Sequence, residues 1–193
     1  MLLFMIRHGE TEGNVKKLFY SQLDMPLTEN GRQQALALRP FLAKYNFDRV
    51  YASDLSRAVE TAKLVLPDRE PILVPQLREC QMGYIDGCTH AEIIGKYGQL
   101  NDHYEQFGGE SPQDMCNRVK TFMEELEANP CDRVAAFAHS GTLKAVLRLA
   151  VGMDCKVSNL LSTNCNIAVF RYENGRWILA AWNLAGNIEG EHT

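Results

Sequence analysis

The sequence lacks the features that mark a membrane-spanning, exported or zinc-bound chain. None of its apolar runs approaches the length needed to cross a bilayer, and the run at residues 1–6 is too short for a signal peptide and follows no basic region. The six cysteines are scattered, and none belongs to a Cys-x-x-Cys pair. We therefore expect reduced thiols, no metal site and no cofactor, in a cytoplasmic protein that does not associate with membranes.

The sequence also lacks an excess of positive charge. It has 20 lysines and arginines against 24 aspartates and glutamates, which gives a formal net charge of -4. This balance argues against non-specific nucleic-acid binding, because such binding needs a basic surface. Any anionic substrate must therefore be attracted by a local cluster of cations.

Internal repeats, low-complexity segments and linkers are absent too. A chain of 193 residues, 46% of them hydrophobic, is long enough for one well-packed domain. We therefore expect a single domain over residues 1–193, as a monomer or a homodimer, with an insertion or lid at about residues 84–110. Polar residues and glycines dominate the second half of that segment.

What the sequence does contain is an alternation of short apolar runs and amphipathic runs, which predict strands and helices respectively. Strands are expected at residues 1–6, 48–52, 71–74 and 132–139, and the last is apolar enough to be central in the sheet. A C-terminal hairpin of residues 165–172 and 176–182 is expected around the turn Glu173-Asn174-Gly175. The pattern predicts an α/β three-layer sandwich: a mostly parallel central sheet, helices on both faces and an antiparallel hairpin at the end.

Start signals precede the expected helices. Thr28 precedes a helical pattern over residues 29–45, in which Pro40 predicts a kink or an early end. Ser53 or Asp54 is expected to cap the next helix, which runs to about residue 66. The later helices are expected after Thr89 with Glu92 (a capping box), after Ser111 with Pro112, and over residues 141–151.

The most informative motif is Arg7-His8-Gly9-Glu10-Thr11, directly after the first expected strand. Open α/β sheets place ligand chemistry at the carboxyl ends of their strands. The guanidinium of Arg7 can bind two phosphate oxygens at once, and the imidazole of His8 can be a neutral nucleophile near pH 7. Gly9 has no side chain, so a phosphate can approach its backbone. The motif predicts a site that holds and attacks a phosphate.

A second imidazole repeats this local arrangement. His139 ends an apolar strand in Ala138-His139-Ser140-Gly141, and a helix is expected to start directly after it. The free N–H groups of that helix favour an anion, so both histidines and Ser140 with Gly141 can converge on one phosphate.

Two further residues are candidates from their surroundings. Arg57 lies one turn into a helix that follows a strand, so it can point to the same edge of the sheet. Glu79 is followed by Gly83 and Gly87, which suggests a loop packed close to other groups. A carboxyl group there can donate a proton to a leaving oxygen.

These residues occur in blocks that resemble the histidine phosphatase superfamily, the phosphoglycerate mutase-like proteins. The resemblance covers nearly the whole chain, and the six blocks in order are far more specific than a single Arg-His-Gly motif. The blocks are Arg7-His8-Gly9-Glu10-Thr11, Pro26-Leu27-Thr28 with Gly31, Ser53-Asp54-Leu55-Ser56-Arg57-Ala58, Leu77-Arg78-Glu79, Gly109-Glu110-Ser111 and His139-Ser140-Gly141.

The resemblance implies a role for each residue. His8 is expected to become a phosphohistidine, and Glu79 to donate a proton and then activate water. Arg7, Arg57 and His139 are expected to bind the phosphoryl oxygens, and Asn14 to add a further phosphate contact. Cations of this kind spread the charge of a metal-free phosphoryl transfer.

The sequence departs from the family pattern at two places. Many members carry Gln-Gly where this chain has Tyr20-Ser21, which bears on the substrate pocket. Ser140 stands where glycine is common, which bears on the phosphate pocket. Neither change removes a catalytic group.

The resemblance allows three functions. The first is a phosphomonoester hydrolase acting on a small phosphorylated metabolite, in the style of the α-ribazole phosphatases. The second is a phosphoglycerate mutase, which needs more cover to exclude water than the short segment between Glu79 and Glu110 supplies. The third is a non-catalytic phosphoester-binding module, which the retained His8 argues against.

The substrate itself is left open by the sequence. Lys16, Lys17, Tyr84, His90 and residues 95–109, together with Tyr20, are candidates to line the entrance. The lysine pair can contact a second anionic group, or it can be a solvated basic pair.

Overall fold

The structure is a computed structural model, and it describes residues 1–100, 103–152 and 160–184. A six-stranded sheet with the order β3-β2-β4-β1-β5-β6 forms its centre. β1 (Leu2–Arg7), β2 (Arg49–Ala52), β3 (Ile72–Leu73) and β4 (Arg133–Ala138) are mutually parallel. β5 (Ile167–Glu173) pairs antiparallel with β1, and β6 (Arg176–Leu184) with β5. The predicted fold class is thereby confirmed.

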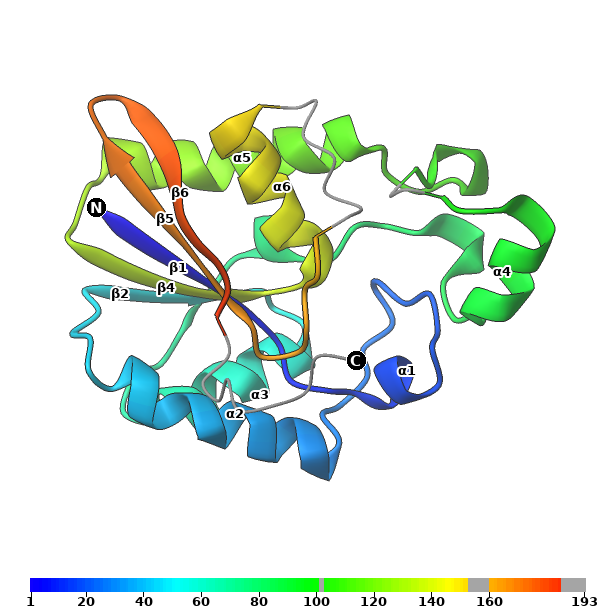
Figure 1. Ribbon diagram of the computed structural model, residues 1–193, viewed down its shortest axis with the longest axis horizontal. Helices are drawn as coiled ribbons and strands as arrows, with labels where there is room; N and C mark the ends of the chain where they lie inside the picture. Colours follow the sequence, from blue (N-terminus) through cyan, green and yellow to red (C-terminus); the bar gives the residue numbers. More distant parts are fainter. Residues whose placement is uncertain (101–102, 153–159, 185–193) are drawn as a thin grey trace.

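Helices cover both faces of the sheet. α2 (Glu29–Leu42) and α3 (Ser56–Val65) pack on one face, and α5 (Pro112–Ala128) and α6 (Ser140–Val151) on the other (Figure 1). β4 is buried on both sides because its side chains alternate: Ala135 and Phe137 join one core cluster, and Val134, Ala136 and Ala138 the other. The prediction that this strand is central is confirmed.

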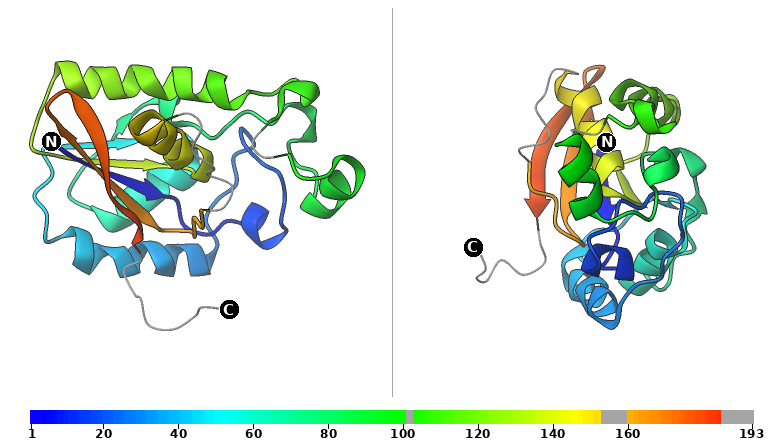
Figure 2. Two further views of the ribbon diagram at one scale, coloured as in Figure 1. Left: turned by 45° about the horizontal axis from the view of Figure 1, so that its top comes forward. Right: turned by 90° about the vertical axis from the view of Figure 1, so that its right-hand side faces the viewer.

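The remaining elements lie beyond the carboxyl ends of the parallel strands. They are α1 (Glu12–Val15), α4 (His90–Tyr97) and three short 3-10 turns, η1 (Pro75–Leu77), η2 (Gly83–Ile85) and η3 (Glu105–Phe107). Figure 2 shows α1 and α4 displaced from the sheet toward that side. The expected insertion at residues 84–110 contains α4 and η3, and residues 101 and 102 of it lie outside the described residues.

Most of the predicted caps are confirmed. Thr28, Thr89 and Ser111 each cap a helix through the side-chain oxygen, the latter two in capping boxes. α2 includes Pro40 and ends two residues later, at Leu42, which is the early end that the proline predicts.

The predicted cap of α3 is wrong. Its N-cap is Leu55, and Asp24 supplies the acceptor: the Ser56 backbone N–H donates to the Asp24 carboxylate at 3.0 Å. The two expected caps have other partners. Ser53 lies 2.9 Å from a ring nitrogen of His139, and Asp54 accepts two hydrogen bonds from Arg78. Local sequence could not reveal this cap, because Asp24 lies in a distant loop.

The described residues contain no helix that is both long and apolar enough to cross a membrane.

The loop after β1 is held against the first turn of α2 by a close backbone approach. A Cβ on Gly31 would lie 2.1 Å from the carbonyl oxygen of Glu10, and a Cβ on Gly9 would lie 2.4 Å from the carbonyl oxygen of Gly31. Neither backbone can give way cheaply, because Thr28 and Glu10 are also joined by hydrogen bonds. Both positions therefore require glycine.

We expect Gly31→Ala to lower the free energy of unfolding by about 1–3 kcal/mol, the usual cost of forcing extra atoms into packed structure. Urea denaturation followed by circular dichroism would measure it. Gly95→Ala is the matched control, since Gly95 is also in a helix but has no atom within 4 Å of a new Cβ. The control is expected to gain stability from the better helix former. Equal stability of the two variants would contradict the close approach.

Candidate active site

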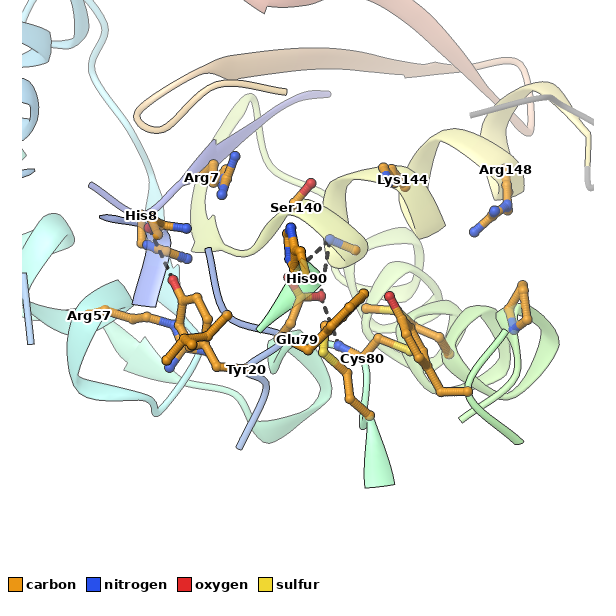
Figure 3. Close-up of a pocket in the computed structure, with 18 residues that line it drawn as sticks. Arg7, His8, Tyr20, Arg57, Glu79, Cys80, His90, Ser140, Lys144 and Arg148 are labelled. Atoms are coloured by element: carbon orange, nitrogen blue, oxygen red, sulfur yellow. Dashed lines mark hydrogen bonds between the residues drawn. The ribbon is translucent and has the colours of Figure 1, made fainter. Parts of the chain in front are cut away.

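A cavity of about 230 Å³ opens at the carboxyl ends of β1 and β4. Figure 3 shows His8 and Arg57 at one end of it, Glu79 and Ser140 in the middle and Arg148 at the other end. The register of the sheet explains why the two histidines meet. Arg7 pairs with Ala138, so His8 and His139 are the next residues on adjacent parallel strands, and their rings lie 5.2 Å apart.

His8 is held as a neutral imidazole. Its Nδ1 lies 2.7 Å from the carbonyl oxygen of Gly9, which can only accept, so Nδ1 carries the proton and Nε2 keeps its lone pair. Burial lowers the pKa of His8 well below 6.5, and the positive charges of Arg57 and Arg7 lower it further. Nε2 is therefore available as a nucleophile at neutral pH.

Arg57 is a fully buried cation with mostly uncharged partners. It donates to the carbonyl oxygens of Ser21 at 2.7 Å and Leu23 at 3.1 Å, and its carbon Cζ lies 4.9 Å from the centre of the Tyr20 ring. The carboxylate of Asp24 is 3.9 Å away. Burial lowers the pKa of Arg57, although the group stays charged.

Arg7 adds a second cation beside His8. It donates through Nη1 to the carbonyl oxygen of Ser162. Its Nε is buried and has no hydrogen-bond partner within the described parts of the chain. A buried guanidinium N–H of this kind is a donor that a phosphoryl oxygen can satisfy.

His139 is fully buried behind His8, and it is not part of the cavity lining. Nε of Arg57 donates to its Nδ1 at 3.2 Å, so its Nε2 carries the proton and donates to Ser53 at 2.9 Å. Burial, and then the charge of Arg57, lower the pKa of His139 well below 6.5. Both ring nitrogens are engaged, so a direct bond to a phosphoryl oxygen requires one partner to be exchanged.

Glu79 sits at the N-terminus of α6. The backbone N–H of Gly141 donates to its two carboxylate oxygens at 3.0 and 3.2 Å, and that of Cys80 donates at 2.8 Å. A Cβ on residue 141 would lie 2.2 Å from Oε1 of Glu79, so glycine is needed there for the carboxylate to approach the helix. The N-terminus of α6 thus holds the candidate acid over the cavity.

Arg118 on α5 fixes the turn that carries Glu79. Its guanidinium donates to the carbonyl oxygens of Gln76, Arg78 and Glu79, and forms an ion pair with Glu110 at 2.8 Å.

Asn14 and Tyr20 line the cavity next to His8. The Tyr20 hydroxyl lies 2.7 Å from that of Thr11 and donates to Oδ1 of Asn14 at 3.1 Å. Burial raises the pKa of Tyr20, so its hydroxyl stays protonated.

The structure places the other predicted site residues in two groups. Ser140 and Gly141 line the cavity, as does His90. Gly9 and Ser21 do not: Gly9 packs on Gly31, which is the reason for its missing side chain, and Ser21 donates its hydroxyl to Asp86 at 2.7 Å.

Three of the candidate entrance residues, Lys16, Lys17 and Tyr84, also lie elsewhere. Lys16 pairs with Glu12 at 3.4 Å, and Tyr84 is 70% exposed with its ring edge against Phe107. Neither they nor Lys17 line the cavity, so the reading of Lys16 and Lys17 as a solvated pair fits their positions.

Two charged residues of the cavity were missed by the sequence reasoning. Lys144 and Arg148 lie one and two turns along α6 from Ser140, and all three line the cavity. Their spacing of four residues was the available signal, but it is equally typical of a solvated helix face. Within the described ranges, no group of three or more His, Cys, Asp or Glu residues is arranged to hold a metal ion.

Comparisons with known proteins agree with this geometry. The family model described as "Histidine phosphatase superfamily (branch 1)" matches residues 3–185. The adenosylcobalamin/alpha-ribazole phosphatase of Salmonella typhimurium is 32% identical over 187 residues, which cover 92% of this chain and 88% of that protein. The metal-independent phosphoserine phosphatase of Arabidopsis thaliana is 29% identical, with 96% and 82% covered.

A solved structure shows the same likeness in three dimensions. It is that of mycobacterial glucosyl-3-phosphoglycerate phosphatase in complex with VO3. It matches with a TM-score of 0.87 at 29% identity, and the match covers 95% of this chain and 99% of the other.

We expect His8 and His139 to be neutral at about pH 6, with opposite tautomers: Nδ1–H for His8 and Nε2–H for His139. Nitrogen-15 shifts of labelled histidines would report both properties. Arg57→Leu removes a charge that disfavours the protonated imidazole, so the pKa of each ring should rise. Arg171→Leu removes an exposed arginine on β5 and serves as the control. A charged His8 at that pH in the unmodified protein would contradict this account.

Proposed function

The chain belongs to branch 1 of the histidine phosphatase superfamily, and we propose that it hydrolyses small phosphomonoesters through a phosphohistidine formed at His8. The observation that supports these residue roles best is the contact of His8 Nδ1 with the Gly9 carbonyl oxygen, which leaves the lone pair on Nε2 beside Arg7 and the buried Arg57. A nucleophile and the donors for phosphoryl oxygens are thus assembled before the substrate arrives.

In the first step, Nε2 of His8 attacks the phosphorus atom. A nitrogen–phosphorus bond forms while the ester phosphorus–oxygen bond breaks, and its electron pair stays on the leaving oxygen. Arg7 and Arg57 bind the equatorial oxygens, on which charge is spread. Glu79 donates a proton to the leaving oxygen, so the alcohol departs uncharged.

In the second step, Glu79 accepts a proton from a water molecule as that water attacks phosphorus. An oxygen–phosphorus bond forms and the nitrogen–phosphorus bond breaks, which returns the electron pair to Nε2 of His8 and releases inorganic phosphate. The Nδ1–H to Gly9 hydrogen bond keeps the ring in the tautomer that each step requires.

His139 acts in this scheme through Arg57. It accepts the Nε–H of Arg57 and is itself anchored by Ser53, so the guanidinium is fixed at the phosphate end of the cavity. The direct phosphate contact that the sequence suggested stays a prediction, and it requires one of these two partners to be exchanged.

Hydrolysis is favoured over mutase chemistry by the small size of the cover above the site. Among the described residues between Glu79 and Glu110 there are only the short elements η2, α4 and η3, and a mutase must keep water from its phosphohistidine. The names of the phosphatases compared above support the same choice.

The proposal also covers the partners, the location and the oligomeric state of the enzyme. The substrate is a small phosphorylated molecule, and the enzyme has no membrane partner. A net charge of -4 argues against nucleic-acid partners. The described cysteines are free thiols, which supports a cytoplasmic location. We take the chain to act as a monomer or a homodimer.

His8→Ala should abolish hydrolysis of p-nitrophenyl phosphate, because no other group can form the covalent intermediate. Loss of radiolabel transfer from substrate to protein should accompany it. Both assays are run with EDTA, since the reaction uses no metal ion. His103→Ala, at an exposed histidine, is the control and should keep full activity. Turnover retained by His8→Ala, or lost by the unmodified protein in EDTA, would overturn the mechanism.

The same assay separates the two transfer reactions. Release of inorganic phosphate from 3-phosphoglycerate indicates a phosphatase, and conversion to the 2-phosphate isomer without phosphate release indicates a mutase.

Gly141→Ala should displace the Glu79 carboxylate, because a new Cβ would lie 2.2 Å from its Oε1. We expect kcat to fall by about 100-fold for an alkyl phosphate, whose leaving oxygen needs a proton, and much less for p-nitrophenyl phosphate. Gly95→Ala is the control. Equal slowing of both substrates would argue that Glu79 is not the proton donor.

A further inference from the structure

The guanidinium of Arg57 depends for two of its contacts on one loop, residues 21–23. Its Nη2 donates to the carbonyl oxygen of Ser21 at 2.7 Å, and its Nη1 donates to that of Leu23 at 3.1 Å. Carbonyl oxygens move with the backbone, so the direction of the guanidinium follows the conformation of this loop. The loop lies between α1 and α2 and outside both helices, so other contacts must fix its conformation.

One carboxylate, that of Asp86, holds the start of this loop. Its Oδ1 accepts the backbone N–H of Ser21 at 2.8 Å. Its Oδ2 accepts the Ser21 hydroxyl at 2.7 Å and the backbone N–H of Gln22 at 3.0 Å. Hydrogen bonds to an ionised acceptor are stronger than those between neutral groups. Two consecutive backbone N–H groups and a hydroxyl are therefore held by a single side chain from the segment between Glu79 and α4.

Asp86 and Arg57 bind opposite ends of the same peptide group. The Gln22 N–H, which donates to Asp86, and the Ser21 carbonyl oxygen, which accepts from Arg57, belong to one planar unit. A rotation of that plane would disturb both hydrogen bonds at once. The carboxylate at the N–H end also polarises the unit, which makes the carbonyl oxygen a better acceptor for the guanidinium. The position of Asp86 is thus transmitted to Arg57 through a single rigid group.

The hydroxyl of Ser21 adds a second link to the same segment. Ser21 is fully buried, and its Oγ donates to Asp86 and accepts the backbone N–H of Met82 at 3.3 Å. Many members of the family carry glycine at this position, and glycine can form neither of these bonds. The departure at Ser21 therefore ties the loop that holds Arg57 to the start of the cover above the site.

We propose that Asp86 and Ser21 are positioning residues, which act through the loop 21–23 to hold the guanidinium of Arg57 in the direction that the phosphoryl group needs. This inference rests on the proposed function, in which Arg57 binds the equatorial oxygens. Neither Asp86 nor Ser21 belongs to the described lining of the cavity, so both act through Arg57. Charge spreads over the equatorial oxygens in the transition state, so a misdirected Arg57 costs more there than in the ground state.

Asp86→Asn tests the link with little change of shape. Whichever way the new amide is turned, its NH2 group faces one of the two backbone N–H groups, so one of them loses its acceptor. The Nε–H of Arg57 donates to His139, and its signal in the proton–nitrogen spectrum of arginine-labelled protein reports the place of the guanidinium. We expect this signal to shift in the variant.

Two anions separate the transition state from the ground state. Orthovanadate can take the five-coordinate geometry of the transferring phosphoryl group, and inorganic phosphate cannot. We expect Asp86→Asn to bind orthovanadate at least about 10-fold more weakly, as the loss of a charge-assisted hydrogen bond allows. Binding of phosphate should weaken by less than about 3-fold, because the ground state depends less on the direction of Arg57.

Asp114→Asn is the matched control. Asp114 accepts the backbone N–H and the hydroxyl of Ser111 at 3.0 and 2.6 Å, a similar pair of contacts, but it caps α5. The control should lose stability, because its capping box is weakened, and should keep the Arg57 signal and both affinities. Ser21→Ala removes only the hydroxyl, so it should show the pattern of Asp86→Asn to a smaller degree. Ser21→Ala decides the test if a melting curve shows that Asp86→Asn is not folded.

Leaving groups exclude an effect through the proton donor. The loop also reaches the turn of Glu79, because Nε2 of Gln22 donates to the Glu79 carbonyl oxygen at 3.1 Å. A misdirected Arg57 should slow hydrolysis of p-nitrophenyl phosphate and of an alkyl phosphate equally. A displaced Glu79 would slow the alkyl phosphate more, since its leaving oxygen needs a proton. Slowing confined to the alkyl phosphate would therefore overturn the inference.

The failure of this inference differs from the failure of the proposed function. An unchanged Arg57 signal, or orthovanadate binding that weakens no more than phosphate binding, would overturn the positioning role alone. Absence of all hydrolysis by the unmodified protein would overturn the proposed function. In that case the Arg57 signal still decides whether Asp86 positions the guanidinium: a shift in Asp86→Asn that is absent in Asp114→Asn supports it, and no shift overturns it.

Discussion

The parallel pairing of β1 with β4 is the constraint on which the candidate site depends. Because Arg7 is opposite Ala138, the chain leaves both strands at the same level, and the two histidines follow side by side. The His8 backbone N–H continues the pairing by donating to Ala138 at 3.0 Å. A shift of one residue would turn every side chain of a strand to the opposite face. The buried alternation of β4 between two core clusters therefore also fixes the position of His8, the candidate nucleophile.

The second requirement is that positive charge stays buried at this point. Arg57 is held by two carbonyl oxygens, a histidine nitrogen and an aromatic ring, which satisfy its hydrogen bonds but cancel little of its charge. Such a site is costly to build in the absence of an anion. Burial lowers the pKa of His8, and the charges of Arg57 and Arg7 lower it further. One arrangement can therefore both attract a phosphoryl group and preserve the lone pair of the candidate nucleophile.

The sequence predicts what depends on local pattern. It predicts the succession of strands and helices along the chain, the helix starts at Thr89 and Ser111, and the hairpin around Asn174. Each of these follows from residues within a few positions of one another. His8 is found because it directly follows an expected strand, and Arg57 because it lies one turn into a helix that follows a strand. Glu79 is a candidate because Gly83 and Gly87 follow it, and the resemblance of the six blocks implies the roles of all three. Their roles in catalysis remain predictions.

Features formed by distant segments are beyond the reach of the same reasoning. The residues around Gly9 and Gly31 in the sequence do not indicate that the two glycines meet. In the same way, the residues before α3 do not indicate that Asp24 caps this helix. Lys144 and Arg148 are hidden for another reason: cations four residues apart usually mark a solvated helix face, and only the packing of α6 decides which face meets the cavity.

The neutral buried histidines make the fold less stable in acid. Their folded pKa values lie below 6.5, so the unfolded chain takes up protons first as the pH falls through that value. Each histidine then removes about 1.4 kcal/mol of stability per pH unit until its own folded pKa is reached, and the arrangement that suits the enzyme near neutrality makes its fold sensitive to acidification.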